Sequence, residues 1–417
     1  AGGTDIAIFQ PTFSHDGKYL AYVSDDTGWG QIYLYDLARR EHRRLTNDAA
    51  EHARPAWIQG MRTLAWRCDS CAIFALRTEK GLVRLWRYGL DGTGEPVQAA
   101  TEFSAFENIA AAPTEDKLAC VASASAIPPC VVVLEPLEGK TPRIITRSRS
   151  IRIKPEACSV ARPVFWNTNN GDIVHGLYYQ PANLGAEEVP PAVVLSHGGP
   201  TLQYTMSFYP EVQFLTSRGY AVLQVNYRGS SGHGREYMLK LRGAWGEIDR
   251  QDLISGAQYL IDKRLADPQR LVAMGNSAGG TTVLLALIHN PGFFRAGVCS
   301  YAVSNMLGLV EDTHKFEEHY LDTMIGCLPE HHEIYLERSA ILYADKIRDA
   351  TLLFQGTDDK VVPRNQSDSI AEALRQNKVP YEYHVFEGEG HGWRKTETIS
   401  AYYASLEKFL RQYVLAK

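Results

Sequence analysis

The chain has 417 residues, a 45% hydrophobic composition and a net charge of −5 at pH 7, which allows two or three domains with buried cores. The mild acidity, with Lys and Arg scattered along the chain, gives no reason to expect nucleic acid as a partner. No apolar run reaches the roughly 18 residues that a membrane span requires, so no membrane partner is expected. Seven cysteines, an odd number, without an apolar leader favour a reducing, cytoplasmic location.

The first 150 residues are predicted to form short strands separated by turns. A turn leads into the β-rich run 19–24, and the same pattern returns at 54–66, so that Leu20 and Leu64 are 44 residues apart. A weaker third copy spans 113–134. A period of about 40–50 residues with several strands in each repeat is typical of β-propeller blades. Three repeats cannot close a ring of about four to eight blades, so we predict a partial propeller whose other blades are missing or lie on another piece.

The basic stretch from Arg143 to Lys154 is predicted to be the junction, with a second domain over 151–417. A hairpin is expected over 164–180, and near-continuous apolar runs then alternate with helical stretches such as Leu253–Arg264. Strands that are apolar on both faces and alternate with helices are typical of a doubly wound parallel sheet. The predicted fold class is therefore α/β, preceded by an all-β partial propeller. The apolar runs lie at 192–195, 221–225, 271–274, 296–299 and 352–354.

The segment Gly275–Gly280, of sequence GNSAGG, lies between a predicted strand and a predicted helix. A G-x-S-x-G pattern in that context indicates a nucleophile elbow, in which a strained backbone presents the serine above the sheet. Small neighbours two residues away on each side are then required, and Gly275 and Gly279 meet this requirement. Ser277 is thus the predicted nucleophile. The alternative is a glycine-rich helix start that packs tightly or binds an anion.

Three further segments supply the groups that such a serine needs. The glycines of Ser196–Pro200 follow a buried strand, and their free N–H groups can hold the oxygen of a tetrahedral intermediate; we assign this role to the N–H groups of Gly199 and Ala278, and a structural role to His197. The loop after Phe354 carries Asp358 and Asp359, either of which could orient a histidine. His391, flanked by glycines at a strand end, is the predicted general base, with His384 inside the strand as the alternative. The order Ser, Asp, His along the chain is that of α/β-hydrolases.

From about Val164 to its end, the chain resembles the catalytic domain of the prolyl oligopeptidase family of serine peptidases, in its acylaminoacyl-peptidase-like branch. In that family's G-x-x-D-x-x-V-P pattern the third residue after the glycine is the triad aspartate, which selects Asp359. The resemblance also implies a propeller that covers the site and admits substrates by size, although the few repeats present here depart from it. The matching strings are HGGP at 197–200, NYRGS at 226–230, GNSAGG at 275–280, and the segments 356–363 and 386–392.

Other polar residues are assigned mainly structural roles. Asp249 and Asp252 lie near a predicted helix start, where carboxylates favour the dipole, and Arg228 is expected to pair with one of them. Lys360 and Arg394 are either solvated or placed to meet a substrate carboxylate. A His- and Glu-rich segment lacks the H-E-x-x-H spacing, so no metal is expected; its members are His314, Glu318, His319, His331, His332 and Glu333.

The sequence thus predicts a serine peptidase that hydrolyses short peptides or acylated aminoacyl substrates through Ser277, Asp359 and His391. Because an acyl-enzyme divides the barrier into two steps, no cofactor is expected. Two alternatives remain: a hydrolase of non-peptide amides or esters with the same triad, and a non-catalytic propeller module, which an intact triad argues against. A partner piece with the missing blades, or a homo-oligomer, is expected. The candidate substrate-binding residues are Asn276, Tyr301 and Val362.

Overall fold

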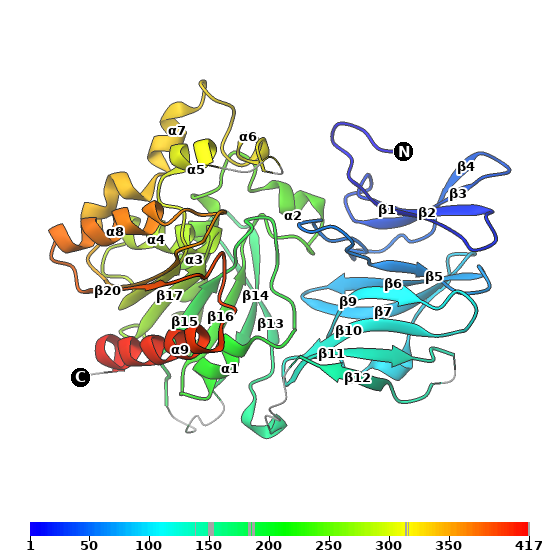
Figure 1. Ribbon diagram of the computed structural model, residues 1–417, viewed down its shortest axis with the longest axis horizontal. Coiled ribbons are helices and arrows are strands. Elements are labelled where there is room, and N and C mark those ends of the chain that lie inside the picture. The colour runs from blue at the N-terminus through cyan, green and yellow to red at the C-terminus, as the bar shows by residue number, and fades with distance from the viewer. Residues whose placement is uncertain are drawn as a thin grey trace. The chain divides into compact units, whose positions relative to one another are not determined.

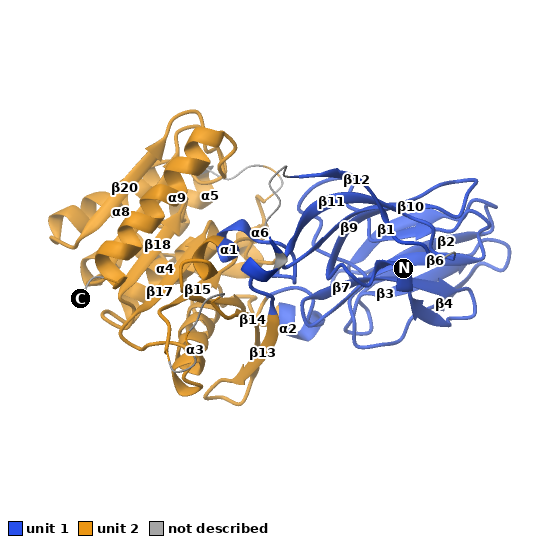
Figure 2. Ribbon diagram, turned by 90° about the horizontal axis from the view of Figure 1, so that it is seen from below, with its two compact units in different colours: residues 1–161, 203–213, 230–238 blue, residues 162–202, 214–229, 239–417 orange. Residues whose placement is uncertain are grey.

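The computed structural model describes residues 1–137, 139–148, 154–181, 185, 188–312, 315 and 317–415. The chain divides into two compact units, which Figure 2 distinguishes by colour. The first comprises residues 1–161, 203–213 and 230–238, and the second comprises 162–202, 214–229 and 239–417. The boundary that the sequence predicts at residue 150 falls in 149–153, outside the described residues. Two short segments from the second half of the chain also belong to the first unit.

The first unit contains three antiparallel sheets of four strands each, formed in chain order (Figure 1). Each sheet places its strands in sequential order, as the blades of a propeller do. The predicted three repeats therefore correspond to three sheets. The strands are β1 (Ile8–Phe13), β2 (Tyr19–Ser24), β3 (Gln31–Asp36), β4 (Glu41–Arg44), β5 (Leu64–Trp66), β6 (Ala72–Glu79), β7 (Leu82–Gly89), β8 (Gly94–Pro96), β9 (Ala105–Ala111), β10 (Leu118–Ala124), β11 (Ile127–Leu134) and β12 (Arg143–Arg147).

The prediction that a junction begins at Arg143 is wrong for its first five residues. Arg143–Arg147 form β12, which pairs antiparallel with β11, so that Val131 lies opposite Thr146. Four of the five residues are exposed, because an outer strand needs hydrogen bonds from one neighbour only and can keep polar side chains in solvent. A basic segment without turn residues is therefore compatible with an edge strand as well as with a linker.

The segment 203–213 joins the first unit through hydrogen bonds to its sheets. The N–H of Met206 donates to the carbonyl of Gly81 at 2.7 Å, and the hydroxyl of Ser104 donates to the carbonyl of Met206 at 2.6 Å. Buried backbone groups require such partners. This segment therefore satisfies its polar groups on the β-rich unit, although it lies between strands of the other one in sequence.

The second unit is built on one eight-stranded sheet of order β13-β14-β16-β15-β17-β18-β19-β20. In this sheet order, β13, β14 and β16 pair antiparallel, and every pair from β16–β15 to β19–β20 is parallel. The predicted hairpin over 164–180 is present as β13 and β14, and all five predicted apolar runs lie in strands. The strands are β13 (Arg162–Asn167), β14 (Ile173–Tyr179), β15 (Ala192–Ser196), β16 (Ala221–Asn226), β17 (Leu271–Asn276), β18 (Ala296–Ser300), β19 (Ala350–Gly356) and β20 (Tyr381–Phe386).

Helices connect these strands and cover both faces of the sheet. Neighbouring residues of a strand point to opposite faces, and in β19 Leu353 belongs to the core cluster with helix α4, whereas the ring of Phe354 lies 4.6 Å from that of Tyr402 in α9. The α-helices are α1 (Pro210–Thr216), α2 (Arg235–Leu239), α3 (Ile248–Asp262), α4 (Ala278–His289), α5 (Met306–Asp312), α6 (Tyr320–Met324), α7 (His332–Glu337), α8 (Asn365–Gln376) and α9 (Thr396–Leu410).

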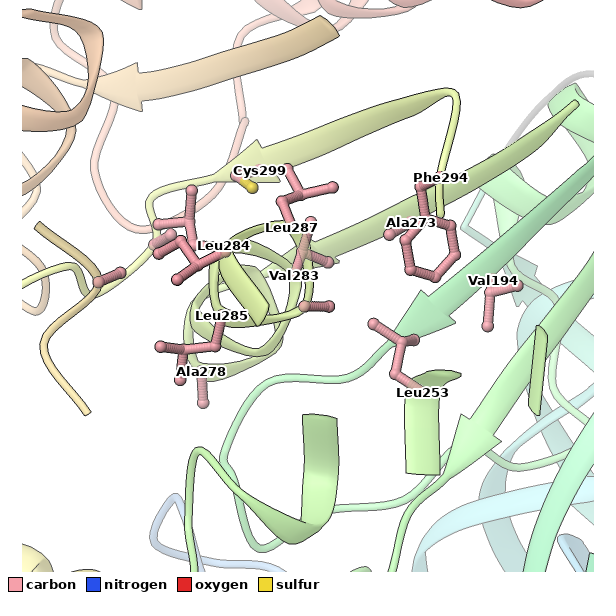
Figure 3. Packing of buried hydrophobic residues seen from close by; sticks show 14 of the residues in the cluster. Val194, Leu253, Ala273, Ala278, Val283, Leu284, Leu285, Leu287, Phe294 and Cys299 are labelled. Atoms are coloured by element: carbon pink, nitrogen blue, oxygen red, sulfur yellow. The ribbon is translucent and has the colours of Figure 1, made fainter. Parts of the chain in front are cut away.

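Helix α4 is an almost completely buried element that supports the site. Every residue from Ala278 to Ile288 is buried, and Figure 3 shows Val283 and Leu287 of this helix beside Ala273 and Cys299 of the sheet. A helix that is buried on all sides has no freedom to shift without opening cavities. The residue immediately before it is therefore held in a fixed position relative to the sheet.

Candidate active site

The turn between β17 and α4 has the backbone of a nucleophile elbow. Ser277 has φ +52° and ψ −128°, a strained conformation for a residue with a side chain. A Cβ atom on Gly275 would lie 2.4 Å from the carbonyl oxygen of Gly279, and one on Gly279 would lie 2.2 Å from the carbonyl oxygen of Ser196. Both flanking positions thus require glycine, as the sequence predicts from the G-x-S-x-G pattern.

The structure brings Ser277, His391 and Asp359 together at the carboxyl edge of the sheet. Nε2 of His391 lies 3.0 Å from Oγ of Ser277, and Nδ1 of His391 lies 2.7 Å from Oδ2 of Asp359. An ionised carboxylate only accepts hydrogen bonds, so Nδ1 carries a proton and donates a hydrogen bond to Asp359. Nε2 is then the acceptor for the serine hydroxyl, which is the arrangement a general base needs.

Asp359 is held by its own loop, whereas Asp358 is not near the imidazole. The side chain of Asp359 is fully buried, and its Oδ1 accepts the N–H groups of Val361 and Val362, both at 2.9 Å. Asp358 is exposed and accepts the hydroxyl of Thr357 at 3.0 Å. The geometry therefore favours Asp359 as the residue that orients His391.

His384 is placed away from this arrangement. It lies in β20, where its ring stacks on Phe354 at 5.4 Å and its Nε2 is 3.1 Å from the carboxylate of Glu382. Neither contact leads to Ser277. The structure therefore gives His384 a packing position in the sheet.

The loop Ser196–Pro200 lies against the elbow. A Cβ on Gly198 would be 3.3 Å from the Cβ of Ser277, and Gly199 has φ +120°, a backbone conformation that favours glycine. No hydrogen bond from the N–H of Gly199 or Ala278 to another described residue is found. Both donors are therefore open to an incoming oxygen, which is what an oxyanion hole requires.

His197 has a structural environment within this loop. Its ring stacks on Tyr227 with centroids 4.2 Å apart, and its Nδ1 lies 2.8 Å from the carbonyl oxygen of Gly198. Burial lowers the pKa of His197 to about 4, so the ring is neutral at pH 7. The hydroxyl of Tyr227 donates to the carbonyl oxygen of Pro200 at 2.8 Å, which joins the loop to the end of β16.

A small cavity of about 50 Å³ opens beside Ser277 within the second unit. Most of its lining residues are apolar, and the polar ones include Ser277, Glu317 and Tyr320, whose hydroxyl lies 2.6 Å from the hydroxyl of Thr201. Burial raises the pKa of Tyr320 to about 12, so this hydroxyl stays neutral. The lining residues are Gly199, Pro200, Trp245, Ser277, Ala278, Val303, Leu309, Glu317, Tyr320, Leu321, Val361 and Val362.

Of the three candidate substrate-binding residues, Val362 lines this cavity, and Asn276 and Tyr301 do not. Tyr301 has φ +41°, and its ring lies 4.4 Å from that of His391, so it packs against the base. Nδ2 of Asn276 donates to the hydroxyl of Tyr301 at 3.4 Å. Sequence reasoning missed Trp245, Glu317 and Tyr320, because no spacing pattern connects residues from separate segments.

The buried acidic residues near the start of α3 serve the scaffold. Arg228 makes a forked hydrogen-bonded pair with Asp252, at 2.7–3.1 Å, and also pairs with Asp172 at 2.8 Å. Burial raises the pKa of Asp252 to about 6 despite this pairing. Asp249 accepts the N–H of Gly246 at 2.6 Å and the hydroxyl of Thr282 at 2.5 Å, and so joins α3 to α4.

Other predicted features can be placed in the same way. Among the described residues, no group of three or more His, Cys, Asp or Glu side chains is arranged to hold a metal; His314 lies outside those residues. Lys360 and Arg394 are exposed. In the part of the chain that the structure describes, no helix combines the length and apolar character that crossing a bilayer requires.

Comparisons with known proteins show to which family the chain is similar. A model of the prolyl oligopeptidase family matches residues 206–416. The chain is 32% identical over 239 residues to dipeptidyl peptidase family member 6 of Caenorhabditis elegans, covering 55% of this chain and 32% of that protein. It is 31% identical over 236 residues to dipeptidyl aminopeptidase BIII of Pseudoxanthomonas mexicana, covering 55% of this chain and 34% of that protein. The chain therefore spans about a third of the length of these relatives.

A solved structure extends the likeness to nearly the whole chain. A puromycin-hydrolysing peptidase of Mycobacterium tuberculosis superposes with a TM-score of 0.93 at 32% identity, covering 99% of this chain and 63% of that one. The predicted fold class, an α/β-hydrolase preceded by a partial β-propeller, is thereby confirmed. This chain belongs to the prolyl oligopeptidase family.

Proposed function

We propose that the protein is a serine peptidase that cleaves short peptides or acylated amino acids. The observation that carries this proposal is the hydrogen-bonded series from Ser277 through His391 to Asp359, at 3.0 and 2.7 Å, beside two unpartnered N–H groups and a cavity. The names of the relatives, a dipeptidyl peptidase and a dipeptidyl aminopeptidase, support peptide substrates. A purely non-catalytic role would give no reason to keep this arrangement.

In the proposed mechanism, Oγ of Ser277 attacks the substrate carbonyl carbon and its proton passes to Nε2 of His391. The resulting oxyanion is stabilised by the N–H groups of Gly199 and Ala278. When the tetrahedral intermediate collapses, the C–N bond breaks and the imidazolium gives its proton to the leaving amine. Water then attacks the acyl-enzyme with His391 again as base, which releases the acid and restores the serine. Asp359 holds the ring and stabilises its positive charge throughout.

The cavity beside the nucleophile supports a preference on the acyl side of the bond. Trp245, Leu309, Leu321 and Val362 contribute apolar surface to it, and burial of an apolar side chain there contributes about 25 cal/mol for each Å² removed from water. We propose that the substrate residue whose carbonyl is attacked carries an apolar side chain.

A second candidate is a hydrolase of non-peptide amides or esters, because a structural relative is described as puromycin-hydrolysing. Purified protein and its Ser277→Ala variant should be compared on aminoacyl, N-acylaminoacyl, dipeptidyl and ester chromogenic substrates, and with a fluorophosphonate probe. We expect probe labelling at Ser277 and turnover of at least one peptide-type substrate, with both lost in the variant. Turnover of esters alone would favour the second candidate, and activity retained in the variant would contradict the mechanism.

The described residues of the first unit form three sheets, which are too few for a closed propeller of about four to eight blades. We propose that further blades, on another piece or a second copy, complete the unit and restrict access to short peptides. Native mass and casein cleavage test whether further blades complete the unit: a soluble 46.5 kDa monomer that degrades denatured casein would contradict this proposal.

All seven cysteines are free thiols, which supports the proposed cytoplasmic location.

A further inference from the structure

Glu389 lies two residues before His391, and its side chain is buried and accepts hydrogen bonds through both oxygens. Only 2% of the residue is exposed. One carboxylate oxygen accepts the N–H of Arg394 at 3.0 Å, and the other accepts the N–H of Lys395 at 2.9 Å. The side chain of Thr398 hydrogen-bonds to the same carboxylate. Hydrogen bonds to an ionised acceptor are roughly twice as strong as neutral ones, so this carboxylate is a strong local anchor.

These bonds close the loop that carries the proposed base. Residues 389 and 394–395 are joined across the loop by the carboxylate, and His391 lies between them. Helix α9 begins at Thr396, so the carboxylate also lies at the N-terminus of a helix, where open N–H groups and the helix dipole favour negative charge. The loop is therefore attached to a rigid helix of 15 residues.

The backbone of Glu389 is attached to the loop of the acid. Its carbonyl oxygen accepts the N–H of Asp358 at 2.9 Å, directly before Asp359. A Cβ on Gly356 would lie only 2.3 Å from that oxygen, so the two loops touch closely at this point. One residue therefore connects the histidine loop to both the acid loop and α9.

The charge of Glu389 is part of this arrangement. Burial acts to raise the pKa of its carboxyl group, but the hydrogen bonds from Lys395, Thr398 and Arg394 outweigh burial and place the pKa below its ordinary value. The group is therefore ionised at neutral pH. A glutamine at this position would keep one acceptor oxygen and would direct an NH₂ donor toward a backbone N–H.

We propose that Glu389 is a positioning residue that holds the imidazole of His391 between Ser277 and Asp359. The proposal rests on the proposed function, because it gives Glu389 a role in the same hydrolytic site. Among the described residues, the side chain of Glu389 bonds to Arg394, Lys395 and Thr398 and not to Ser277 or Asp359, so its effect is exerted through the loop. A displacement of about 1 Å at a reacting group can cost about 100-fold in rate.

The test compares Glu389→Gln with Glu387→Gln, a matched change at an exposed glutamate of the same loop. We expect Glu389→Gln to lower kcat about 100-fold with KM within about twofold of the native value, and to slow fluorophosphonate labelling in parallel. Glu387→Gln should match the native protein. Glu389→Asp, which keeps the charge, should recover part of the loss in kcat.

A spectroscopic measurement separates positioning from general stability. The proton on Nδ1 of His391, bonded to Asp359 at 2.7 Å, should give a low-field proton NMR resonance in the native protein and in Glu387→Gln. This resonance should be lost or broadened in Glu389→Gln, at temperatures where circular dichroism shows the variant folded. Should that variant fail to fold, Thr398→Val removes one donor only and should give a smaller loss of kcat, of several-fold.

The outcomes are distinguishable. The role of Glu389 would be overturned if Glu389→Gln kept a native-like kcat and an unchanged resonance. If Glu389→Gln does not fold, the same result in both Thr398→Val and Glu389→Asp would overturn it. A native protein without turnover and without labelling of Ser277 would instead contradict the proposed function. In that case the resonance alone still decides whether Glu389 positions His391.

Discussion

Glu51 makes the stability of the first unit dependent on pH in a direction opposite to that of most acidic residues. Its Oε2 accepts the N–H of Gly30 at 2.8 Å, and Gly234 also donates a backbone hydrogen bond to it. Burial nevertheless raises the pKa of Glu51 from 4.5 to about 7, and the charge of Asp25 adds to this rise. Between these two pH values the folded protein holds a proton that the unfolded chain has released, so the free energy of unfolding falls as pH rises.

The magnitude follows from the two pKa values. The rise in pKa from 4.5 to about 7 corresponds to about 3 kcal/mol in the free energy of unfolding. Because Glu51 keeps some solvent exposure, we expect a measured effect of about 1–2 kcal/mol. This stabilisation is fully present below pH 4.5 and is lost as pH rises through about 7. In Glu51→Gln, whose amide is neutral throughout, that loss should be absent.

Urea unfolding followed by tryptophan fluorescence at about pH 5 and about pH 8 measures this effect. The free energy of unfolding of the native protein should fall from about pH 5 to about pH 8 by about 1–2 kcal/mol more than that of Glu51→Gln. Glu102→Gln, at an exposed position of the same unit, is the control and should follow the native protein. Parallel pH dependence in the native protein and Glu51→Gln would refute the reasoning.

The remaining predictions concern the proposed site. Asp359→Asn should lower kcat about 10⁴-fold because the imidazole loses its acceptor, whereas the exposed Asp358→Asn should change kcat less than about tenfold; steady-state kinetics would contradict the assignment if the two effects were reversed. His391→Gln should abolish turnover and His384→Gln should not, and an active His391→Gln enzyme would rule out this base. Gly279→Ala should abolish probe labelling and lower Tm by several degrees, because its methyl group would lie 2.2 Å from a backbone oxygen; a labelled, native-like variant would show that the elbow tolerates a Cβ.

Local patterns predicted much of this fold and of the candidate site. The G-x-S-x-G segment contains part of its own reason for glycine, since the clash at Gly275 arises within the turn, whereas the clash at Gly279 is with Ser196 on a neighbouring strand. The apolar runs correspond to strands because a sheet covered on both faces excludes polar side chains from its centre. The choice between Asp358 and Asp359 was open from spacing alone, and came from the family pattern.

Other features depended on contacts between distant segments. Arg143–Arg147 form a strand through pairing with β11, which their basic composition does not indicate. The segment 203–213 belongs to the first unit because its backbone groups bond to Gly81 and Ser104. The cavity wall collects Trp245, Glu317 and Tyr320 from segments that no periodicity connects.

The sequence by itself determined most of the element types, their order and the strained turn at Ser277, because these depend mainly on neighbours within a few residues. Only the tertiary structure decided which carboxylate lies 2.7 Å from His391, which side chains surround the cavity, and that the carboxylate of Glu389 closes the histidine loop. The physical reason is that the first two are contacts between segments far apart in the sequence, and that the third fixes a loop between a strand and a helix. Their distances are set by the packing of the whole sheet and its helices, which no single segment encodes.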